Sequence, residues 1–392
     1  MPEISNQVRS IIEAVRQRGD KALCEFAQRF DKIRLQPRDL VVSARELKDA
    51  RKKVSPAFLK AIQESARAIE SFAREEKKRL LTQWTVTQGS ARVGQLVRAV
   101  DSVGLYIPGG RFPYPSTVLM TAIPARIAGV QRIVMASPPK NLTPEVLAAA
   151  AYAGCETVFR VGGAGAIAAM AYGTERIPPV DFIVGPGNPY VTEAKRQVFG
   201  QVGIDSLAGP SEVVIIADRT APVDAIQADL SAQAEHDPQA RAVLFSTDAA
   251  LITQVRRGID PSIKNRIHLC RVKNLDAAFE EVNRIAPEHL ELLIAKPERF
   301  LAKVRHAGAV FLGTSTPTAI GDYVAGPSHV LPTNRSARFS SGLSVATFLK
   351  RSSVIGFKAR SSERSRWEAA LTLAQTEGMK YHARSLRCRV AR

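Results

Sequence analysis

From the segment SVGLYIPGG onward, short runs rich in β-branched residues alternate with stretches of helical periodicity. Among the features of this sequence, this alternation limits the possible folds more than any other. The runs include RIVMASP, TVFRVGG, DFIVGPG and EVVIIAD, separated by segments such as TPEVLAAAAYAG and PYVTEAKRQVFG. Such alternation is typical of parallel βαβ units. A second series follows, with RAVLFST, NRIHLCRV and GAVFLGT between helical stretches. The sequence therefore predicts two α/β halves, each with its own parallel sheet.

The flanking segments do not follow this alternation. Residues 4 to about 80 are predicted to be helical, with Ser43 and Glu46 at the spacing of a capping box. The segment WTVTQGSARVGQLVRAV has the pattern of a hairpin, with Gly89 near its turn. From about Ser344 the chain is strongly basic and is predicted to be helical. We therefore expect an α/β protein with two incomplete Rossmann-like parallel domains, N-terminal helices and a helical C-terminal segment.

The charge of the chain raises the question of an anionic partner. The chain has 392 residues, 45% of them apolar, and a formal charge of +18. Such a charge suits nucleic acid. However, the Lys and Arg residues are spread along amphipathic segments, and the sequence contains no basic tail, zinc finger or aromatic-rich binding strand. A solvated basic surface is the favoured interpretation, so no nucleic-acid partner is expected.

Other features of the sequence bear on the cellular compartment. No apolar run approaches the roughly 18 residues that a membrane helix needs. The start, MPEISNQVRS, lacks the apolar stretch of a secretory signal. The four cysteines are far apart in sequence, so their spacing indicates neither a zinc ribbon nor a redox pair. These features predict a cytoplasmic protein that does not bind membranes.

Three glycine-rich turns follow predicted strands. YIPGGRFPYPS starts at Tyr106, GGAGAIA contains Gly163-x-Gly165-x-x-Ala168, and GPGNPY sets Asn188 at the start of a helix. Glycines let the backbone approach a phosphate, while helix N-termini offer N–H groups to it. A tight strand-to-helix turn is the better explanation of any single one. Three such turns from one sheet leave a nucleotide crevice and plain turns as equal alternatives.

A polar pair interrupts the apolar face of one predicted helix. The apolar stripe of Val223, Ile226 and Leu230 continues with Gln233, and His236 follows three residues later. A buried amide and imidazole need partners. Candidate partners lie in three later stretches, as Glu288, His289, Asp322, His329, Glu377 and His382. Imidazole, carboxylate and amide oxygen suit Zn²⁺ or Mn²⁺, but a satisfied core network is the alternative, and spacing alone does not decide between them.

Eight blocks of sequence resemble one enzyme family, the histidinol dehydrogenases. They are VRSIIEAVRQRGDKAL, VGLYIPGG with PSTVLMTAIPARIAGV, GPGNPYVTEAKRQV, AGPSEVVIIAD, DLSAQAEHDP, NRIAPEHLEL, GDYVAGPSHVLPT and EGMKYHARSLR. They stand in the family's order and extend from about residue 7 to the end of the chain. The resemblance implies a zinc- and NAD-dependent enzyme that oxidises L-histidinol, through L-histidinaldehyde, to L-histidine, the last two steps of histidine biosynthesis.

The resemblance also implies roles for particular residues. Glu288 and His289 would be the catalytic acid/base groups, and one Zn²⁺ per subunit would be bound by Gln233, His236, Asp322 and His382. Ser211, His329 and Glu377 would contact the substrate, together with His289 and the metal ligands. NAD would contact Tyr106, Gly165 and Asn188. Relatives usually carry Gln at the position of Gly165, so the glycine pattern there does not indicate a standard dinucleotide mode.

The family's assembly gives an expected domain organisation. Residues 1–106 with 213–343 would form the zinc and substrate domain, and residues 107–212 the cofactor domain. Residues 344–392 would complete the site of the partner subunit in an intertwined homodimer. The change at Gly165 and a shortened region before Asn265 leave open a related NAD-dependent dehydrogenase of another amino or sulfonated alcohol. A nucleic-acid-binding protein and a degenerate homologue are further alternatives, and retention of the whole proposed site argues against the latter.

Overall fold

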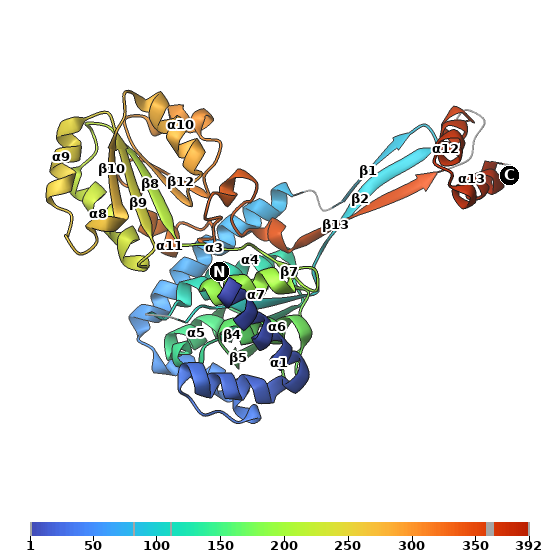
Figure 1. Cartoon of the computed structure of the whole chain (residues 1–392), viewed down its shortest axis with the longest axis horizontal. Coiled ribbons are helices and arrows are strands. Elements are labelled where there is room, and N and C mark those ends of the chain that lie inside the picture. The colour runs from blue at the N-terminus through green and yellow to red at the C-terminus, as the bar shows by residue number, and fades with distance from the viewer. Residues whose placement is uncertain (1, 81–82, 110–111, 358–363, 391–392) are drawn as a thin grey trace. The chain divides into compact units, whose positions relative to one another are not determined.

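The computed structural model describes residues 2–80, 83–109, 112–357 and 364–390, and the chain divides into two units. The first unit comprises residues 1–77 and 100–348, and the second comprises residues 78–99 and 349–392. Two five-stranded parallel sheets with helices on their faces make up most of the first unit (Figure 1). The predicted α/β class with two parallel sheets is confirmed. Among the helices in the described ranges, none is long and apolar enough to cross a membrane.

The first sheet reverses its strand order in the middle. Its strands are β3 (Ser102–Tyr106), β4 (Arg132–Ser137), β5 (Thr157–Arg160), β6 (Phe182–Val184) and β7 (Gly203–Ile204). They lie in the order β5-β4-β3-β6-β7 and are all parallel. The direction of winding changes between β3 and β6. In doubly wound sheets, ligands bind beyond the carboxyl ends of the strands at this point.

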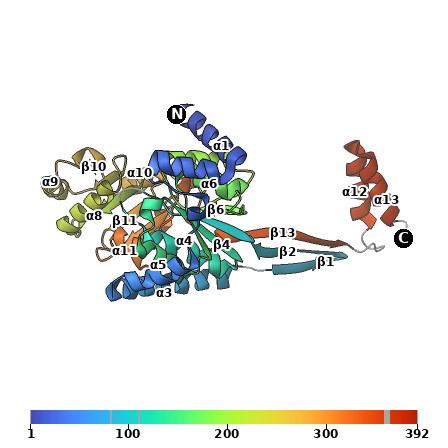
Figure 2. The same ribbon diagram turned by 90° about the horizontal axis from the view of Figure 1, so that it is seen from below.

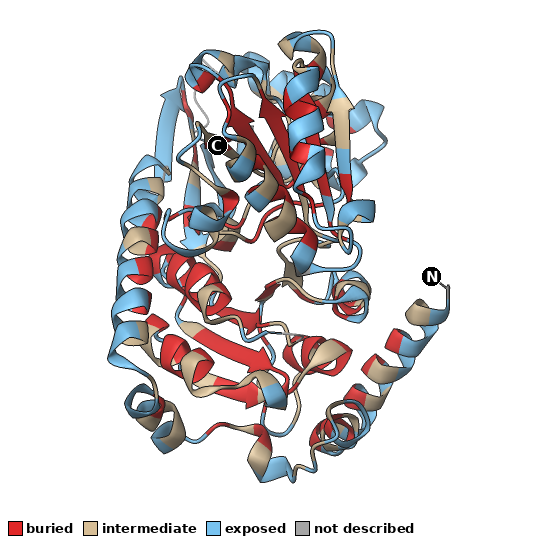
Figure 3. Cartoon of the chain, turned by 90° about the vertical axis from the view of Figure 1, so that its left-hand side faces the viewer, coloured by how far each residue is buried: buried red, intermediate tan, exposed pale blue. Residues whose placement is uncertain are grey.

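Helices cover the first sheet. They are α4 (Pro115–Ala128), α5 (Pro144–Ala153), α6 (Gly163–Tyr172) and α7 (Pro189–Val198), joined by the N-terminal helix α1 (Pro2–Phe26). Val15 and Leu23 of α1 are buried in one apolar cluster with residues of α6, α7 and the strands, including Ile167 and Ile183. The strands of both sheets are largely buried, as the red ribbons in Figure 3 show.

The second sheet repeats the strand order of the first. Its strands are β8 (Glu212–Ala217), β9 (Arg241–Ser246), β10 (Ile267–Arg271), β11 (His289–Leu293) and β12 (Ala309–Leu312), in the order β10-β9-β8-β11-β12. Val213 and Ile215 of β8 pack in one cluster with α8 (Val223–His236) and α9 (Ala249–Arg257). Val214 of β8 packs in another cluster, with α10 (Leu275–Ile285). Burial on both faces explains why the run EVVIIAD is continuously apolar from Val213 to Ala217.

Aspartates occupy the carboxyl edge of this second sheet. Asp218, directly after β8, accepts hydrogen bonds from the N–H groups of Thr220 (2.8 Å) and Ala295 (2.9 Å). Asp248, two residues after β9, caps α9 by accepting from the N–H groups of Ala250 and Leu251. The side chains that the resemblance assigns to catalysis belong to the opposite edge, where β11 begins.

The second unit is a three-stranded antiparallel sheet with two helices. Its strands are β1 (Gln83–Gln88), β2 (Ala91–Ala99) and β13 (Leu349–Phe357), and its helices are α12 (Arg364–Thr376) and α13 (Lys380–Val390). Figures 1 and 2 show the three strands side by side. The predicted hairpin is confirmed, with Gly89 at positive φ in its turn. The predicted helix is wrong for Leu349–Phe357, which forms a strand because its backbone pairs along the full length of β2.

The observed division of the chain differs from the expected domain boundaries. β3 belongs to the first sheet, although residues 1–106 were expected to join the second half. α1 packs on α6 and α7 because its apolar side chains share their cluster. Two more N-terminal helices, α2 (Ala44–Asp49) and α3 (Pro56–Arg79), complete this region, and Ser43 caps α2 as predicted by accepting from the N–H of Glu46.

Candidate active site

The end of α8 buries an amide whose nitrogen has no partner among the described residues. Ile226 and Leu230 are fully buried, and Gln233 continues their stripe with 4% of its surface exposed. Among the described residues, no group hydrogen-bonds its Nε2 atom. His236 is the last residue of α8, and its side chain lies outside the described part. A buried amide with an idle end is costly unless something else binds it, so this end of α8 suits a ligand.

Glu288 and His289 are fixed by the main chain of Glu212. Both lie where β11 starts, next to the start of β8 in the parallel register, and both are buried. The Glu212 N–H donates to Glu288 Oε2 over 3.0 Å. His289 Nδ1 lies 3.3 Å from the Glu212 carbonyl oxygen, which only accepts hydrogen bonds, so Nδ1 carries the proton. In the neutral ring, Nε2 is therefore the basic nitrogen.

Burial changes the protonation of two neighbouring carboxyls. Burial raises the pKa of Glu288 to about 8, and the charge of Asp322 acts in the same direction, against hydrogen bonds from Glu212 N–H and Ser211. Burial and the charge of Glu288 raise the pKa of Glu212 to about 7, although Arg241 opposes this. Both side chains therefore favour the neutral form more than an exposed glutamate does. A cation bound at Asp322 would act on Glu288 in the opposite direction.

Asp322 and His329 form a second polar group near this edge. Asp322 lies in α11 (Thr318–Tyr323), which packs against α8. His329 Nδ1 lies 3.1 Å from the Asp322 carbonyl oxygen and 3.7 Å from its Oδ1 atom. His329 Nε2 lies 3.1 Å from Thr117 Oγ1, on α4 of the first half. Residues from both halves of the first unit therefore meet at His329.

Two buried carboxyl groups, those of Glu291 and Asp229, connect the elements that carry the site. Glu291 is fully buried and accepts from the N–H of Thr318, the first residue of α11, over 2.8 Å. Asp229, one turn before Gln233 on α8, is close enough for its carboxyl group to interact with that of Glu291. Burial, and then the charge of Asp229, raise the pKa of Glu291 to about 8. This pair joins α8, β11 and α11.

Sequence reasoning missed these supporting residues. Glu212 directly follows Ser211 in AGPSEV. Glu291 comes two residues after His289 in EHLEL, and the two-residue period of a strand places these two side chains on one face. Asp229 precedes Gln233 by one helical turn. These spacings were available signals. Nothing in the sequence pointed to Thr117.

The proposed metal ligands fall into both units. Gln233 and Asp322 belong to the first unit, on helices that pack together. His382 in α13 and Glu377, just after α12, belong to the second unit, and both side chains are exposed. Within the described ranges, no three His, Cys, Asp or Glu side chains are grouped closely enough to hold a metal ion. The oxygen donors of Gln233 and Asp322 nevertheless fit Zn²⁺, which accepts mixed nitrogen and oxygen ligands.

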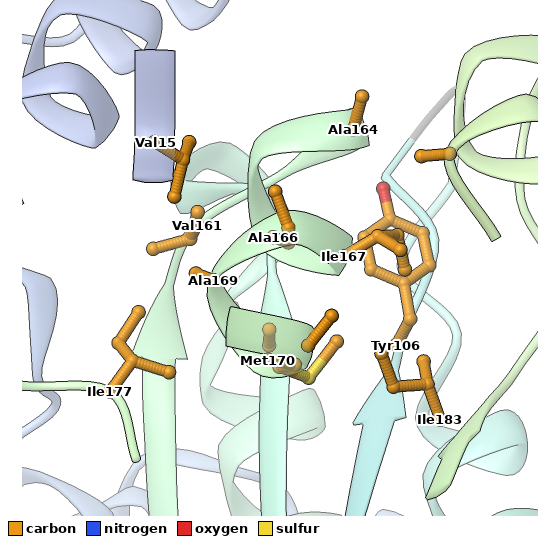
Figure 4. Close-up of a cluster of buried hydrophobic side chains, with 14 of the residues drawn as sticks. Val15, Tyr106, Val161, Ala164, Ala166, Ile167, Ala169, Met170, Ile177 and Ile183 are labelled. Carbon is orange, nitrogen blue, oxygen red and sulfur yellow. The ribbon is translucent and has the colours of Figure 1, made fainter. Parts of the chain in front are cut away.

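The proposed cofactor residues surround the reversal of the first sheet. Tyr106 ends β3, is 2% exposed and accepts the Gly163 N–H on its hydroxyl over 3.0 Å. Its ring packs near Ile167 and Ile183 (Figure 4), and burial raises its pKa to about 12. Gly165 is buried, and a Cβ there would lie 3.4 Å from Leu23 and Phe26 of α1.

Asn188 is the exposed member of this set. Its Oδ1 caps α7 by accepting from the N–H groups of Tyr190 and Val191, and its place at the start of this helix is as predicted. Its amide nitrogen remains available to donate to a ligand. Of the three proposed cofactor residues, Asn188 is therefore the most accessible to a ligand. Tyr106 and Gly165 are buried and pack beneath the turns.

The raised carboxyl pKa values predict how stability depends on pH. Glu288 and Glu291 bind protons in the folded state up to pH of about 8, whereas their ordinary pKa is 4.5. Folding therefore takes up protons between these values, and the free energy of unfolding of the metal-free protein should fall as pH rises from 5 to 8. Thermal unfolding across this range measures it. The Glu291→Gln variant should show a shallower fall than the Glu280→Gln variant, whose carboxyl is exposed; equal slopes would contradict the prediction.

Comparison with known proteins identifies the class. The sequence model of the family described as histidinol dehydrogenase matches residues 1–390. A histidinol dehydrogenase of Synechococcus sp. is 49% identical, covering 97% of this chain and 91% of its own. One from Gluconobacter oxydans is 46% identical over 99% and 93% of the two chains. The crystal structure of histidinol dehydrogenase from Elizabethkingia anophelis superposes with a TM-score of 0.92 at 34% identity, covering 98% and 92%.

The fold and these matches together define a dehydrogenase, an oxidoreductase with two doubly wound halves. The family match extends over residues 1–390 and does not rest on one motif alone. The chain belongs to the histidinol dehydrogenase family.

Proposed function

We propose that the protein oxidises L-histidinol to L-histidine through L-histidinaldehyde, with two NAD⁺ as electron acceptors. The observation that carries this proposal is the buried Glu288 and His289 pair, held by the main chain of Glu212. The reaction needs a base for the alcohol proton and a group that activates water. This pair offers both functions side by side. The relatives named above support histidinol over another amino or sulfonated alcohol.

His289 suits the role of general base for the alcohol. Loss of hydride from the alcohol carbon requires loss of the hydroxyl proton, and imidazole titrates near neutral pH. Because Nδ1 is directed at the Glu212 carbonyl, Nε2 is the nitrogen that accepts this proton. The ring of Phe311, with its centroid 5.9 Å from that of His289, limits access of water on one side.

Glu288 suits the second oxidation. An aldehyde cannot yield a hydride to form an acid until water has added to it, and a carboxylate can accept the proton of that water. Glu288 does this only when ionised. Its raised pKa means that the basic form increases as pH rises towards 8.

The proposed zinc site takes its ligands from the residues that the family resemblance assigns. Gln233, His236 and Asp322 would hold one Zn²⁺ with His382, and the substrate would also contact Ser211, His329 and Glu377. The burial of Gln233 on α8, which packs against the α11 helix that carries Asp322, supports this assignment. When bound, zinc supplies a template that orients the substrate for hydride transfer. We place NAD at the carboxyl edge of the first sheet, with Tyr106, Gly165 and Asn188.

We further propose a cytoplasmic homodimer in which Glu377 and His382 act in the partner's site. Both side chains are exposed in the single chain. Residues that enter the site of another subunit have to be accessible in this way. The sheet of the second unit also exposes apolar side chains, including Trp84, Val86 and Ile355, which is unusual unless another surface covers them.

NADH formation from L-histidinol tests the proposed function. We expect L-histidinol to yield two NADH per molecule, with L-histidine as the final product. Removal of the metal by a chelator should abolish this activity, because the substrate loses the template that orients it. Added Zn²⁺ should restore the activity. A protein that reduces NAD⁺ equally well after complete metal removal, or that leaves histidinol unchanged, contradicts the proposal.

A further inference from the structure

Gly185 lies at the point where the first sheet reverses its order. It directly follows β6, which is the neighbour of β3 at the reversal, and it begins the turn that leads to Asn188. Its φ of +116° favours glycine, and a Cβ would lie 2.0 Å from the Tyr106 carbonyl oxygen. The turn is therefore pressed against the end of β3. Any movement of Gly185 would move the residues that follow it.

Two charged side chains hold both polar groups of Gly185. The Gly185 N–H donates to Asp205 Oδ2 over 2.8 Å, and Lys195 Nζ donates to the Gly185 carbonyl oxygen over 2.9 Å. Lys195 and Asp205 also form an ion pair with each other. Lys195 comes from α7, and Asp205 directly follows β7. The glycine is thus enclosed by two segments that are ten residues apart.

This ion pair is almost completely buried. The Lys195 side chain is 2% exposed and that of Asp205 is 5% exposed. Removing two charges from water is costly, and a well-packed apolar pair of similar volume is often as stable. Stability alone therefore explains such a pair poorly. The pair does, however, fix a backbone position through directional bonds, which apolar side chains cannot do.

Asp205 also connects the turn to the segment that enters the catalytic half. Its Oδ1 accepts from the N–H of Ser206 over 2.7 Å. Further along, Thr192 of α7 donates from Oγ1 to the Ala208 carbonyl oxygen over 2.9 Å. The Gly209 N–H donates to Thr333 Oγ1, in the second half, over 2.6 Å. This segment ends at Ser211, and its bonds to Thr192 and Thr333 hold it without Lys195 or Asp205.

We propose that Lys195 and Asp205 are positioning residues that hold the Gly185–Asn188 turn in place for NAD. The inference rests on the proposed function, because that function places NAD at this turn. Neither side chain touches the cofactor, since both are buried behind the turn. Their effect acts through Gly185, whose N–H and carbonyl groups they bind. Loss of the pair should therefore weaken the binding of NAD and leave the binding of histidinol unchanged.

Three variants test the inference. Lys195→Met and Asp205→Asn each leave one buried charge unpaired, so each should lower the thermal midpoint by about 5 °C or more. The double variant K195M/D205N leaves no unpaired charge and should recover most of that loss. Its KM for NAD⁺ should still rise about tenfold or more, with kcat and the KM for L-histidinol within about threefold of wild type. Its directly measured NAD⁺ dissociation constant, from calorimetric titration without substrate, should rise by the same factor.

The matched control is Arg196→Met, which removes a positive charge from the next position of α7. Arg196 pairs with Glu193 over 2.6 Å on the surface and has 54% of its side chain exposed. This variant should leave the NAD⁺ constants unchanged. The inference is overturned if folded K195M/D205N binds NAD⁺ as wild type does, or if KM for L-histidinol rises equally. If wild type binds NAD⁺ but does not oxidise histidinol, the proposed function fails, and the calorimetric comparison alone decides the inference.

Discussion

The Glu288→Gln variant should produce L-histidinaldehyde from L-histidinol but almost no L-histidine. Glutamine keeps the shape of the side chain and can still accept the Glu212 N–H, so His289 keeps its position. It cannot accept a proton from water, and loss of a general base typically lowers a rate by about 10²- to 10⁴-fold. We expect this loss when the aldehyde is the substrate and less than about tenfold loss in the first hydride transfer. Single-turnover NADH formation from each substrate measures both.

The pH dependence provides a second readout for this variant. In the wild type, the rate of acid formation should rise with pH through the pKa of Glu288, which burial raises and a cation at Asp322 lowers, because only the ionised form is a base. In Glu288→Gln this rise should disappear. Glu280→Gln, at an exposed position of α10, is the control and should behave as wild type. Equal losses at both steps would refute separate roles for Glu288 and His289.

Two inactive variants should restore activity when their subunits are mixed. We expect His289→Ala and His382→Ala each to lose at least about 100-fold, the first for lack of a base and the second for lack of a metal ligand. If His382 serves the partner's site, a hybrid dimer contains one site with both native histidines. Random exchange of subunits makes half of the dimers hybrids, so the mixture should recover about a quarter of wild-type activity.

A control pair separates exchange from other effects. His382→Ala mixed with Glu377→Gln should stay inactive, because both residues come from the same segment and every hybrid site lacks one of them. Dilution to monomers should also abolish wild-type activity. An active monomer, or a histidine mixture that recovers nothing after verified exchange, would place all the ligands in one chain.

The sequence predicted those features that depend on local pattern. The apolar stripe of α8 predicted that Gln233 is buried, and the glycine-rich turn before α7 predicted that Asn188 stands at the start of that helix. Both follow from periodicity and capping chemistry, which involve neighbouring residues. The alternation of strands and helices likewise predicted two parallel sheets, because most of the buried strands are rich in apolar residues.

The features that sequence reasoning missed depend on contacts between distant segments. The bonds of Glu212 to Glu288 and His289 arise because β8 and β11 lie side by side, which no spacing reveals. β13 was missed because most of its residues are exposed, so burial leaves no alternating pattern in its sequence. The Lys195 and Asp205 pair is similar, since α7 and the end of β7 meet only in the folded chain. The roles of the zinc and NAD residues stay predictions from the family resemblance.

The repeated strand order gives this enzyme two crevices of the same topology, but their electrostatic properties differ. At the reversal of the second sheet, Asp218 and Asp248 already accept the main-chain N–H groups of the turns after β8 and β9. A pyrophosphate arriving there would meet two carboxylates and would have to displace them from their own hydrogen bonds. Asp218 and Asp248 therefore leave these N–H groups unavailable to a phosphate, which favours the first sheet as the proposed NAD site.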